Sequence, residues 1–138
     1  MIAHSEWQHD KTFQGISENG NTALFDSDSA HTKGPSPMEA VLMALCGCTS
    51  VDVVSILEKK RQLLTGLRVT AVAEQASEAP RVFTRIHLTY AVRGQLSRKA
   101  VEDAVVLSKN KYCSVSKMLE KSVAIDYEIV YPDGEPMP

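Results

Sequence analysis

Three cysteines are the residues of this sequence whose type and spacing most clearly allow chemistry: Cys46, Cys48 and Cys113. Cys46 and Cys48 are two positions apart, which turns their side chains about 200° from each other on a regular helix. They therefore cannot act as a pair there, and Cys-x-Cys in a helix has the wrong geometry for a zinc site. We predict no metal site and no cofactor, and we interpret Cys46 as a small side chain that fills the apolar side of the helix.

Cys48 and Cys113 remain as candidate reactive thiols. Cys48 lies about 18 Å along a helix that starts near Ser36, beyond the first turn in which the helix dipole acts. A neighbour in space must lower its pKa, and the alternative is a buried, unreactive thiol. Cys113 precedes a short helix and has three lysines within four residues, a setting that lowers a thiol's pKa. These lysines are Lys109, Lys111 and Lys117. Local electrostatics therefore favours Cys113 as the more activated thiol.

The other nucleophiles and bases form no recognisable motif. The four histidines share no common spacing, and we interpret them as surface or strand residues rather than as catalytic bases. Thr49 and Ser50 lack the strand-turn-helix context of a nucleophile elbow, so serine hydrolase chemistry is not predicted.

The bulk composition narrows the class of protein. The chain has 138 residues and a formal net charge of -2. Charges of both signs are interspersed, which argues against binding to nucleic acid or to an anionic membrane. Residues 1–7 are polar where a signal peptide would need an apolar core, so we expect a cytoplasmic protein with reduced cysteines. The length predicts a single domain over residues 1–138.

A long helix over Ser36–Lys60 must position Cys48. Ser36 is the predicted N-cap, Pro37 occupies the first helical position, and Glu39 completes a capping box. Residues 40–48 are apolar or glycine all around the helix, which predicts that protein covers it on several sides. Polar residues follow directly, and the apolar run is well short of the ~20 residues that a bilayer requires, so no membrane span is predicted.

The remaining elements predict an α+β fold with a mainly antiparallel sheet and a long central helix. Alternation of apolar and polar residues predicts strands, and Asn19-Gly20 predicts a two-residue hairpin turn. The strand over 82–93 should place Val82, Thr84, Ile86, Leu88, Tyr90 and Val92 on one face. The predicted strands are 7–17, 22–25, 67–75, 82–93 and 123–131, and the strands 67–75 and 82–93 should form an antiparallel hairpin. A loop is predicted over 26–35, and helices are predicted over 97–109 and 114–121.

Two cysteine-containing segments carry a resemblance to a known family. The sequence Gly-Pro-Ser-Pro-Met-Glu at 34–39 leads into Ala-Leu-Cys-Gly-Cys-Thr at 44–49, and Tyr-Cys-Ser-Val follows at 112–115. This combination resembles the OsmC/Ohr family of thiol-dependent peroxidases, and most of all its small YhfA-like branch. The resemblance implies an OsmC-like fold and an intertwined homodimer with an active site at the subunit interface.

The same resemblance implies a role for each thiol. Cys48 would be the peroxidatic cysteine that attacks an organic or hydrogen peroxide and becomes a sulfenic acid. Cys113 would resolve this intermediate to a disulfide, which an external dithiol reductant then opens. This order reverses the ranking by local electrostatics. It also leaves the lysines around Cys113 as candidates to activate Cys48, should they lie near it in the folded dimer.

Two positions depart from the family pattern. Well-characterised members place a glutamate ten residues before the peroxidatic cysteine, where this chain has Met38, and Glu39 matches only the broader pattern as a supporting carboxylate. They also use an N-terminal arginine to hold the thiolate, whereas the first arginine here is Arg61. Lys11 is the nearest basic candidate for a charge partner, and a lysine supplies charge without a bidentate fork.

Two alternatives to peroxidase function stay open. The chain would instead be a non-catalytic dimer that binds a small apolar ligand near Cys48, or that senses redox state through its thiols. Met38, Met43 and the apolar shell around the helix favour such a pocket. A weaker alternative is transfer of sulfane sulfur through a persulfide on one cysteine.

Overall fold

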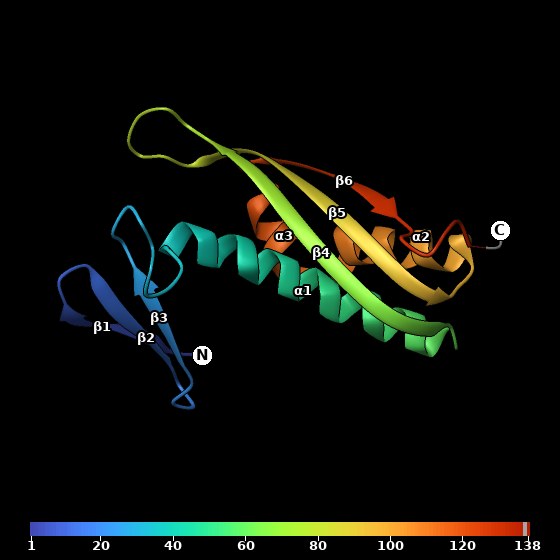
Figure 1. The fold of residues 1–138 in the computed structure, drawn as a ribbon, viewed down its shortest axis with the longest axis horizontal. Helices are drawn as coiled ribbons and strands as arrows, with labels where there is room; N and C mark the ends of the chain where they lie inside the picture. The colour runs from blue at the N-terminus through green and yellow to red at the C-terminus, as the bar shows by residue number, and fades with distance from the viewer. Residues whose placement is uncertain (137) are drawn as a thin grey trace. The chain divides into compact units, whose positions relative to one another are not determined.

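A computed structural model describes residues 1–136 and 138 of the chain (Figure 1). The chain separates into two compact units, residues 1–43 and residues 44–138, and the division falls inside the long helix. Each unit is described by itself below. The single domain over 1–138 stays a prediction.

The first unit contains an antiparallel sheet of three strands, in the order β1 (Ala3–His9), β2 (Thr12–Ser17) and β3 (Thr22–Asp26). The prediction of one unbroken strand over 7–17 is wrong, because the chain turns at Asp10, whose φ is +49°. The hydroxyl of Thr12 donates a 2.8 Å hydrogen bond to the carbonyl of His9 and closes this turn. Apolar periodicity does not mark the turn, since both strands carry mixed side chains.

The turn at Asn19-Gly20 is confirmed, but it is longer than predicted. The Gly20 N–H donates to the Ser17 carbonyl at 2.9 Å, and the Ser17 N–H donates to the Asn21 carbonyl at 2.9 Å. Three residues therefore lie between the paired positions. Gly20 has a φ of +83°, a conformation that glycine adopts without steric cost.

Helix α1 (Pro37–Lys59) begins as the sequence predicts. The Glu39 N–H donates to Ser36 Oγ at 3.1 Å, and the Ser36 N–H donates to Glu39 Oε1 at 3.0 Å. This reciprocal pair is a capping box, which satisfies a helical donor and fixes the entry of the chain.

Within the second unit, α1 buries a single stripe of side chains at every fourth position. These are Leu45, Thr49, Val53 and Leu57. The predicted coverage of residues 40–48 on several sides is wrong for the chain alone, because Met43 stays 61% exposed. Farther along the helix, Val51 is 69% exposed. By its length and composition alone, α1 could cross a bilayer. The core helices of other proteins meet the same criterion, so this is weak evidence for a membrane span.

The second unit holds the other sheet, in the order β4 (Leu63–Gln75), β5 (Phe83–Gln95) and β6 (Ala124–Val130). Strands β4 and β5 form the predicted antiparallel hairpin, whereas β6 pairs with β5 in parallel. A register shift lies between Glu74, opposite Arg85, and Gln75, opposite Phe83. Phe83 is therefore buried, and the predicted inward orientation of Val82 and Thr84 is wrong, since both are exposed.

Three short helical segments connect β5 to β6: α2 (Arg98–Leu107), the π-helical turn η1 (Ser108–Tyr112) and α3 (Ser114–Leu119). A parallel pair requires such a crossover. Ser97 caps α2 as predicted, accepting a 3.0 Å hydrogen bond from the Ala100 N–H. The predicted helix to Lys109 leaves α geometry at Ser108, because the Cys113 N–H donates to the Ser108 carbonyl, five residues back, at 2.8 Å.

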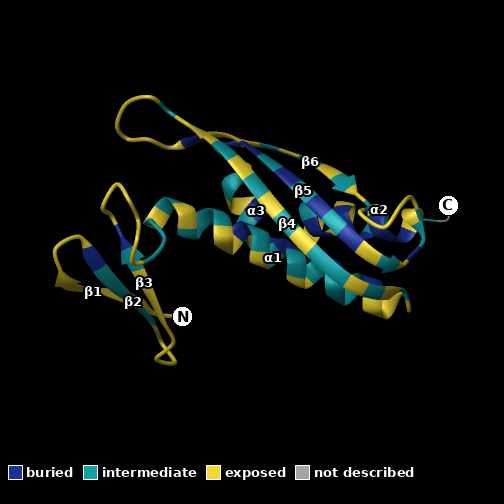
Figure 2. Cartoon of the chain, viewed as in Figure 1, coloured by how far each residue is buried: buried dark blue, intermediate teal, exposed yellow. Residues whose placement is uncertain are grey.

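The core of the second unit combines one face of β5 with the buried faces of α1 and α2. Buried residues concentrate on these elements in Figure 2. The fully buried members are Leu45, Val53 and Leu57 of α1, Ile86, Leu88, Tyr90 and Val92 of β5, and Val101, Ala104 and Val105 of α2. This core fixes the helix that carries Cys48 and the crossover that carries Cys113.

Candidate thiol site

The structure brings together the two cysteines that the sequence singled out. Cys48 lies in α1 and is half-buried, whereas Cys113 directly precedes α3 and is fully buried. The two thiols lie close enough for Cys48 to affect the ionisation of Cys113 directly. The Ser116 N–H donates to Cys113 Sγ at 3.4 Å, and Ser116 Oγ donates to the Cys113 carbonyl at 3.1 Å. These bonds hold Cys113 as the N-cap of α3.

Burial raises the pKa of Cys113 above the ordinary value for a thiol. The hydrogen bonds from Ser116 oppose this rise, and the neighbouring Cys48 adds to it. The prediction that its surroundings lower the pKa of Cys113 is therefore wrong. At neutral pH the proton stays on Cys113, and Cys48 is the thiol that solutes can reach.

Two of the three lysines expected to activate Cys113 bind other groups. Lys109 donates to the Ile125 carbonyl at 2.8 Å and lies over the Tyr127 ring, 5.6 Å from its centroid. Lys117 Nζ is 2.6 Å from Glu120 Oε1. Proximity in sequence to Cys113 therefore does not determine which groups these lysine side chains contact in the fold.

Cys46 is half-buried in α1, and burial raises the pKa of its thiol. A hydrogen bond with the backbone of Ala71, in β4, opposes this rise. The Cys46 carbonyl accepts a 2.7 Å hydrogen bond from Ser50 Oγ. Cys46 thus contacts the sheet and sits in the packing between α1 and β4.

Glu39 and Lys11, the two supporting residues predicted for the site, both lie in the first unit. The backbone and side chain of Ser36 hydrogen-bond with Glu39 and hold its pKa below the ordinary value. Lys11 Nζ is 3.9 Å from Asp28 Oδ1, and its side chain is mostly exposed. Glu39 therefore has a capping role, and the roles of both residues at the thiols stay predictions.

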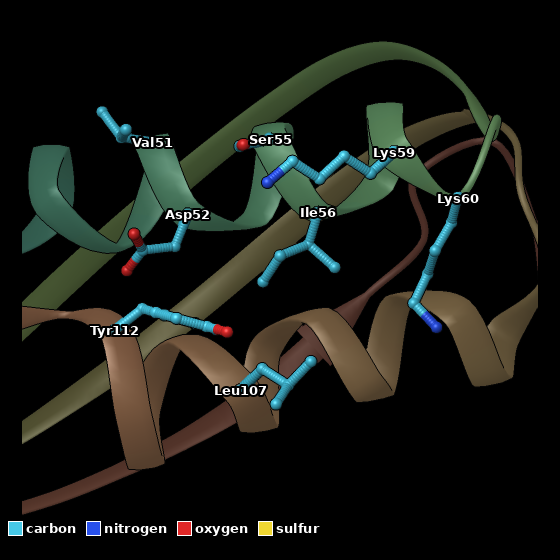
Figure 3. Close-up of a pocket in the computed structure, with 8 residues that line it drawn as sticks. All are labelled: Val51, Asp52, Ser55, Ile56, Lys59, Lys60, Leu107 and Tyr112. Atoms are coloured by element: carbon cyan, nitrogen blue, oxygen red, sulfur yellow. The ribbon is translucent and has the colours of Figure 1, made fainter.

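A pocket of about 350 Å³ lies between α1 and the segment formed by α2 and η1 (Figure 3). Its lining residues are Val51, Asp52, Ser55, Ile56, Lys59, Lys60, Leu107 and Tyr112. Asp52 and Ile56 extend from α1 toward the facing Tyr112. The pocket combines an apolar wall with a carboxylate and two ammonium groups, and Tyr112 directly precedes Cys113 in the chain.

A chain of hydrogen bonds beside the thiols was missed from the sequence. Thr49 Oγ1 lies 2.8 Å from Tyr90 Oη and 2.8 Å from Ser108 Oγ, and Ser108 Oγ donates to Asp52 Oδ2 at 2.8 Å. The available signal was the presence of hydroxyl residues on apolar stripes, Thr49 among the leucines of α1 and Ser108 after Val101, Ala104 and Val105. Such residues need buried partners.

Among residues 1–136 and 138, no group of three or more histidine, cysteine and acidic side chains is arranged to hold a metal ion. The donor set at the site is a pair of thiols beside neutral hydroxyl groups. The arrangement supports thiol-disulfide chemistry between two cysteines.

A long helix carrying one cysteine, with a second, buried cysteine at the end of a helical crossover, defines a two-thiol α+β protein. The family model described as OsmC-like protein matches residues 30–128, and the chain belongs to this family. Protein YhfA of Escherichia coli strain K12 is 49% identical over 133 residues, covering 94% of this chain and 98% of the relative.

Solved structures share the fold. The crystal structure of a hypothetical protein from Aquifex aeolicus VF5 has a TM-score of 0.82 at 30% identity, covering 96% of this chain and 97% of the other. An organic hydroperoxide resistance protein from Legionella pneumophila has a TM-score of 0.70 at 13% identity, covering 93% and 94%. The second likeness shows the fold alone. The resemblance to the OsmC/Ohr family, and to its YhfA-like branch, is confirmed.

Proposed function

We propose that this protein is a thiol peroxidase that reduces organic or hydrogen peroxide through Cys48 and Cys113. The observation that carries the proposal is the meeting of two thiols from distant parts of the chain, one reachable and one buried with its pKa raised. The existence of organic hydroperoxide resistance proteins with the same fold supports the substrate class.

The reaction divides between the two cysteines. The Cys48 thiolate attacks one peroxide oxygen, the O–O bond breaks, and the departing alkoxide or hydroxide takes a proton to leave as an alcohol or water. Cys48 is then a sulfenic acid. The Cys113 sulfur attacks the Cys48 sulfur, the disulfide forms, and the sulfenic oxygen leaves as water with the Cys113 proton. An external dithiol returns two electrons and restores both thiols, which suits a reducing cytoplasm.

Counting thiols after peroxide exposure tests this proposal. One equivalent of cumene hydroperoxide should remove two of the three thiols of the reduced protein and leave an intrachain Cys48–Cys113 disulfide, identified by peptide mapping. Cys48→Ser should abolish peroxide consumption, because it removes the attacking sulfur. Cys113→Ser should still consume one equivalent and accumulate a sulfenic acid, trapped by dimedone.

Cys46→Ser is the matched control, since it removes the third thiol from the same helix and should preserve the loss of two thiols. A Cys48 thiol that stays reduced in excess peroxide would reject the proposal. Glu39→Gln and Lys11→Gln test the two predicted supporting residues, because each keeps a similar size and removes the charge. We expect a lower rate of peroxide consumption in both variants.

We also propose that the protein works as a homodimer. Every residue of β1 is exposed, and a three-stranded sheet normally needs one covered face to be stable. On α1, Val51 is exposed although it lies in an apolar helix. A second copy of the chain is the occupant that the family resemblance implies for these surfaces.

The pocket beside Asp52 favours a second candidate function, the binding of a small apolar ligand by a non-catalytic or redox-sensing dimer. Its lining includes the apolar side chains of Val51, Ile56 and Leu107 together with charged groups. Native mass spectrometry of the purified protein tests this candidate. A bound small molecule whose loss accompanies Cys48 oxidation would support it, and a ligand-free protein that consumes peroxide would reject it.

A further inference from the structure

Four polar side chains in the second unit form one continuous line of hydrogen bonds. Asp52 of α1, Ser108 of η1, Thr49 of α1 and Tyr90 of β5 are joined by three bonds of 2.8 Å each. Thr49, Ser108 and Tyr90 are each at most 1% exposed, so water does not replace these bonds. Buried polar groups of this kind strongly favour the geometry that satisfies them.

The direction of each bond follows from the number of hydrogens available. Ser108 Oγ donates its one hydrogen to the Asp52 carboxylate. Ser108 must then accept from Thr49, and Thr49, having donated, must accept from Tyr90. Every donor therefore points toward Asp52. Removing the hydroxyl of Thr49 or of Ser108 leaves the group on each side of it without its partner.

The line connects the two segments that carry the thiols. Thr49 directly follows Cys48 in α1. Ser108 opens η1, and its carbonyl accepts the Cys113 N–H at 2.8 Å, which closes the π-helical turn. The side chain of Ser108 is thus fixed to α1 while its backbone holds Cys113. Tyr90 lies within electrostatic range of Cys113, and burial raises the pKa of Tyr90 to about 12, so it stays a donor.

We propose that Ser108 and Thr49, oriented by Asp52, are positioning residues that set the placement of Cys113 against Cys48 and thereby the ease of disulfide formation. The catalytic consequence rests on the proposed function, because only there does disulfide formation complete a reaction cycle. The placement itself is a property of the fold. It is measurable as the effective concentration of one thiol at the other.

A glutathione redox titration tests this proposal without any peroxide. Glutathione disulfide accepts two electrons and two protons from the thiol pair, giving two glutathione molecules and the Cys48–Cys113 disulfide. The titration uses the full chain carrying Cys46→Ser, so that only two thiols react. We expect Ser108→Ala and Thr49→Val to lower the effective concentration about tenfold. Each variant leaves a buried hydroxyl without its partner, which weakens the connection between α1 and η1.

Two matched variants separate positioning from general destabilisation. Ser97→Ala removes a hydroxyl that caps α2, at the other end of the same helical segment, and should keep the effective concentration of the parent. Thr49→Ser keeps the bridging hydroxyl and should rescue most of the loss seen in Thr49→Val. The comparison of these two Thr49 variants remains decisive even where Ser108→Ala does not fold.

An unchanged effective concentration in Ser108→Ala and Thr49→Val would overturn the proposal. An equal loss in Ser97→Ala would also overturn it, because the effect would then follow stability. Parent protein that reaches a normal glutathione equilibrium but does not react with peroxide would reject the proposed function alone. A parent that forms no Cys48–Cys113 disulfide at any glutathione ratio would overturn both.

Discussion

At the level of single residues, burial decides the state of Cys113 more than nearby charge does. The sequence places three lysines around this thiol, yet its pKa is raised because the sulfur is removed from water. Lysine side chains are long, and Lys109 and Lys117 reach other partners. Counting nearby lysines did not predict the pKa of Cys113, because the sequence gives the backbone position of a lysine and not the position of its ammonium group.

His87 provides a test of electrostatics on the outer face of the second sheet. Its Nδ1 lies 2.5 Å from Asp126 Oδ1, and its Nε2 lies 3.3 Å from Glu128 Oε1. Its hydrogen bond with Asp126 has the largest effect on the pKa of His87 and raises it, and the hydrogen bond with Glu128 raises it further. A raised folded-state pKa means that His87 adds stability below about pH 6.5, its ordinary pKa, and that this contribution is lost as pH rises through the raised value.

Replacing His87 by glutamine should therefore lower the free energy of unfolding at about pH 6 and change it little at about pH 9. Urea denaturation of both proteins across this range measures the difference. The control is the same replacement in an Asp126→Asn, Glu128→Gln background, where the pH dependence should largely disappear. A difference between wild type and His87→Gln that does not vary with pH would contradict the assigned ion pairs.

At the level of elements, the features that depend on nearby residues were predictable. The start of α1 and the N-cap of α2 follow from short-range hydrogen bonds, and the sequence predicts both correctly. The register shift near Glu74 and the π-helical turn at Ser108 were not predicted, since each depends on how a segment meets its neighbours. One displaced residue in a strand then reverses which side chain faces the core.

The capping box at the start of α1 separates two roles for Glu39. Ser36→Ala removes the acceptor of the Glu39 N–H and should lower the free energy of unfolding by about 1 kcal/mol, measured by chemical denaturation. Glu39→Gln keeps an oxygen that accepts the Ser36 N–H, so its stability should stay near that of the wild type. Lower peroxide consumption in Glu39→Gln at unchanged stability would then assign Glu39 to the chemistry, whereas unchanged consumption would limit it to capping.

At the level of the whole molecule, the fold class was predictable and the family resemblance implied the pair of thiols, but the line of hydrogen bonds beside them could not be predicted. The long helix, the hairpin and the position of each cysteine all follow from patterns along the chain. The bonds from Thr49 to Tyr90 and from Thr49 to Ser108 join residues 41 and 59 positions apart. No periodicity in one sequence encodes such a distant match, and it became visible only with the three-dimensional arrangement.

The proposed dimer gives a prediction at this scale. Val51→Glu places a charge on the exposed apolar side of α1 and should shift the protein toward monomer, because a buried charge without a partner is costly. Sedimentation velocity at micromolar concentration measures the change. Val72→Glu is the matched control, since Val72 is similarly exposed at 64% but lies in β4, an edge strand of the second sheet. Dimers of equal strength in both variants would place the subunit contact elsewhere.

The parallel pairing of β5 with β6 has a consequence for the synthesis of the protein. Residues 96–123 must leave the ribosome and fold back before β6 can join the sheet, and this crossover contains Cys113. Cys113 is fully buried in the folded protein, so its thiol is more accessible to oxidants before this crossover has folded than afterwards. The unfolded chain during synthesis is therefore the state in which Cys113 reacts most readily with an oxidant from solution.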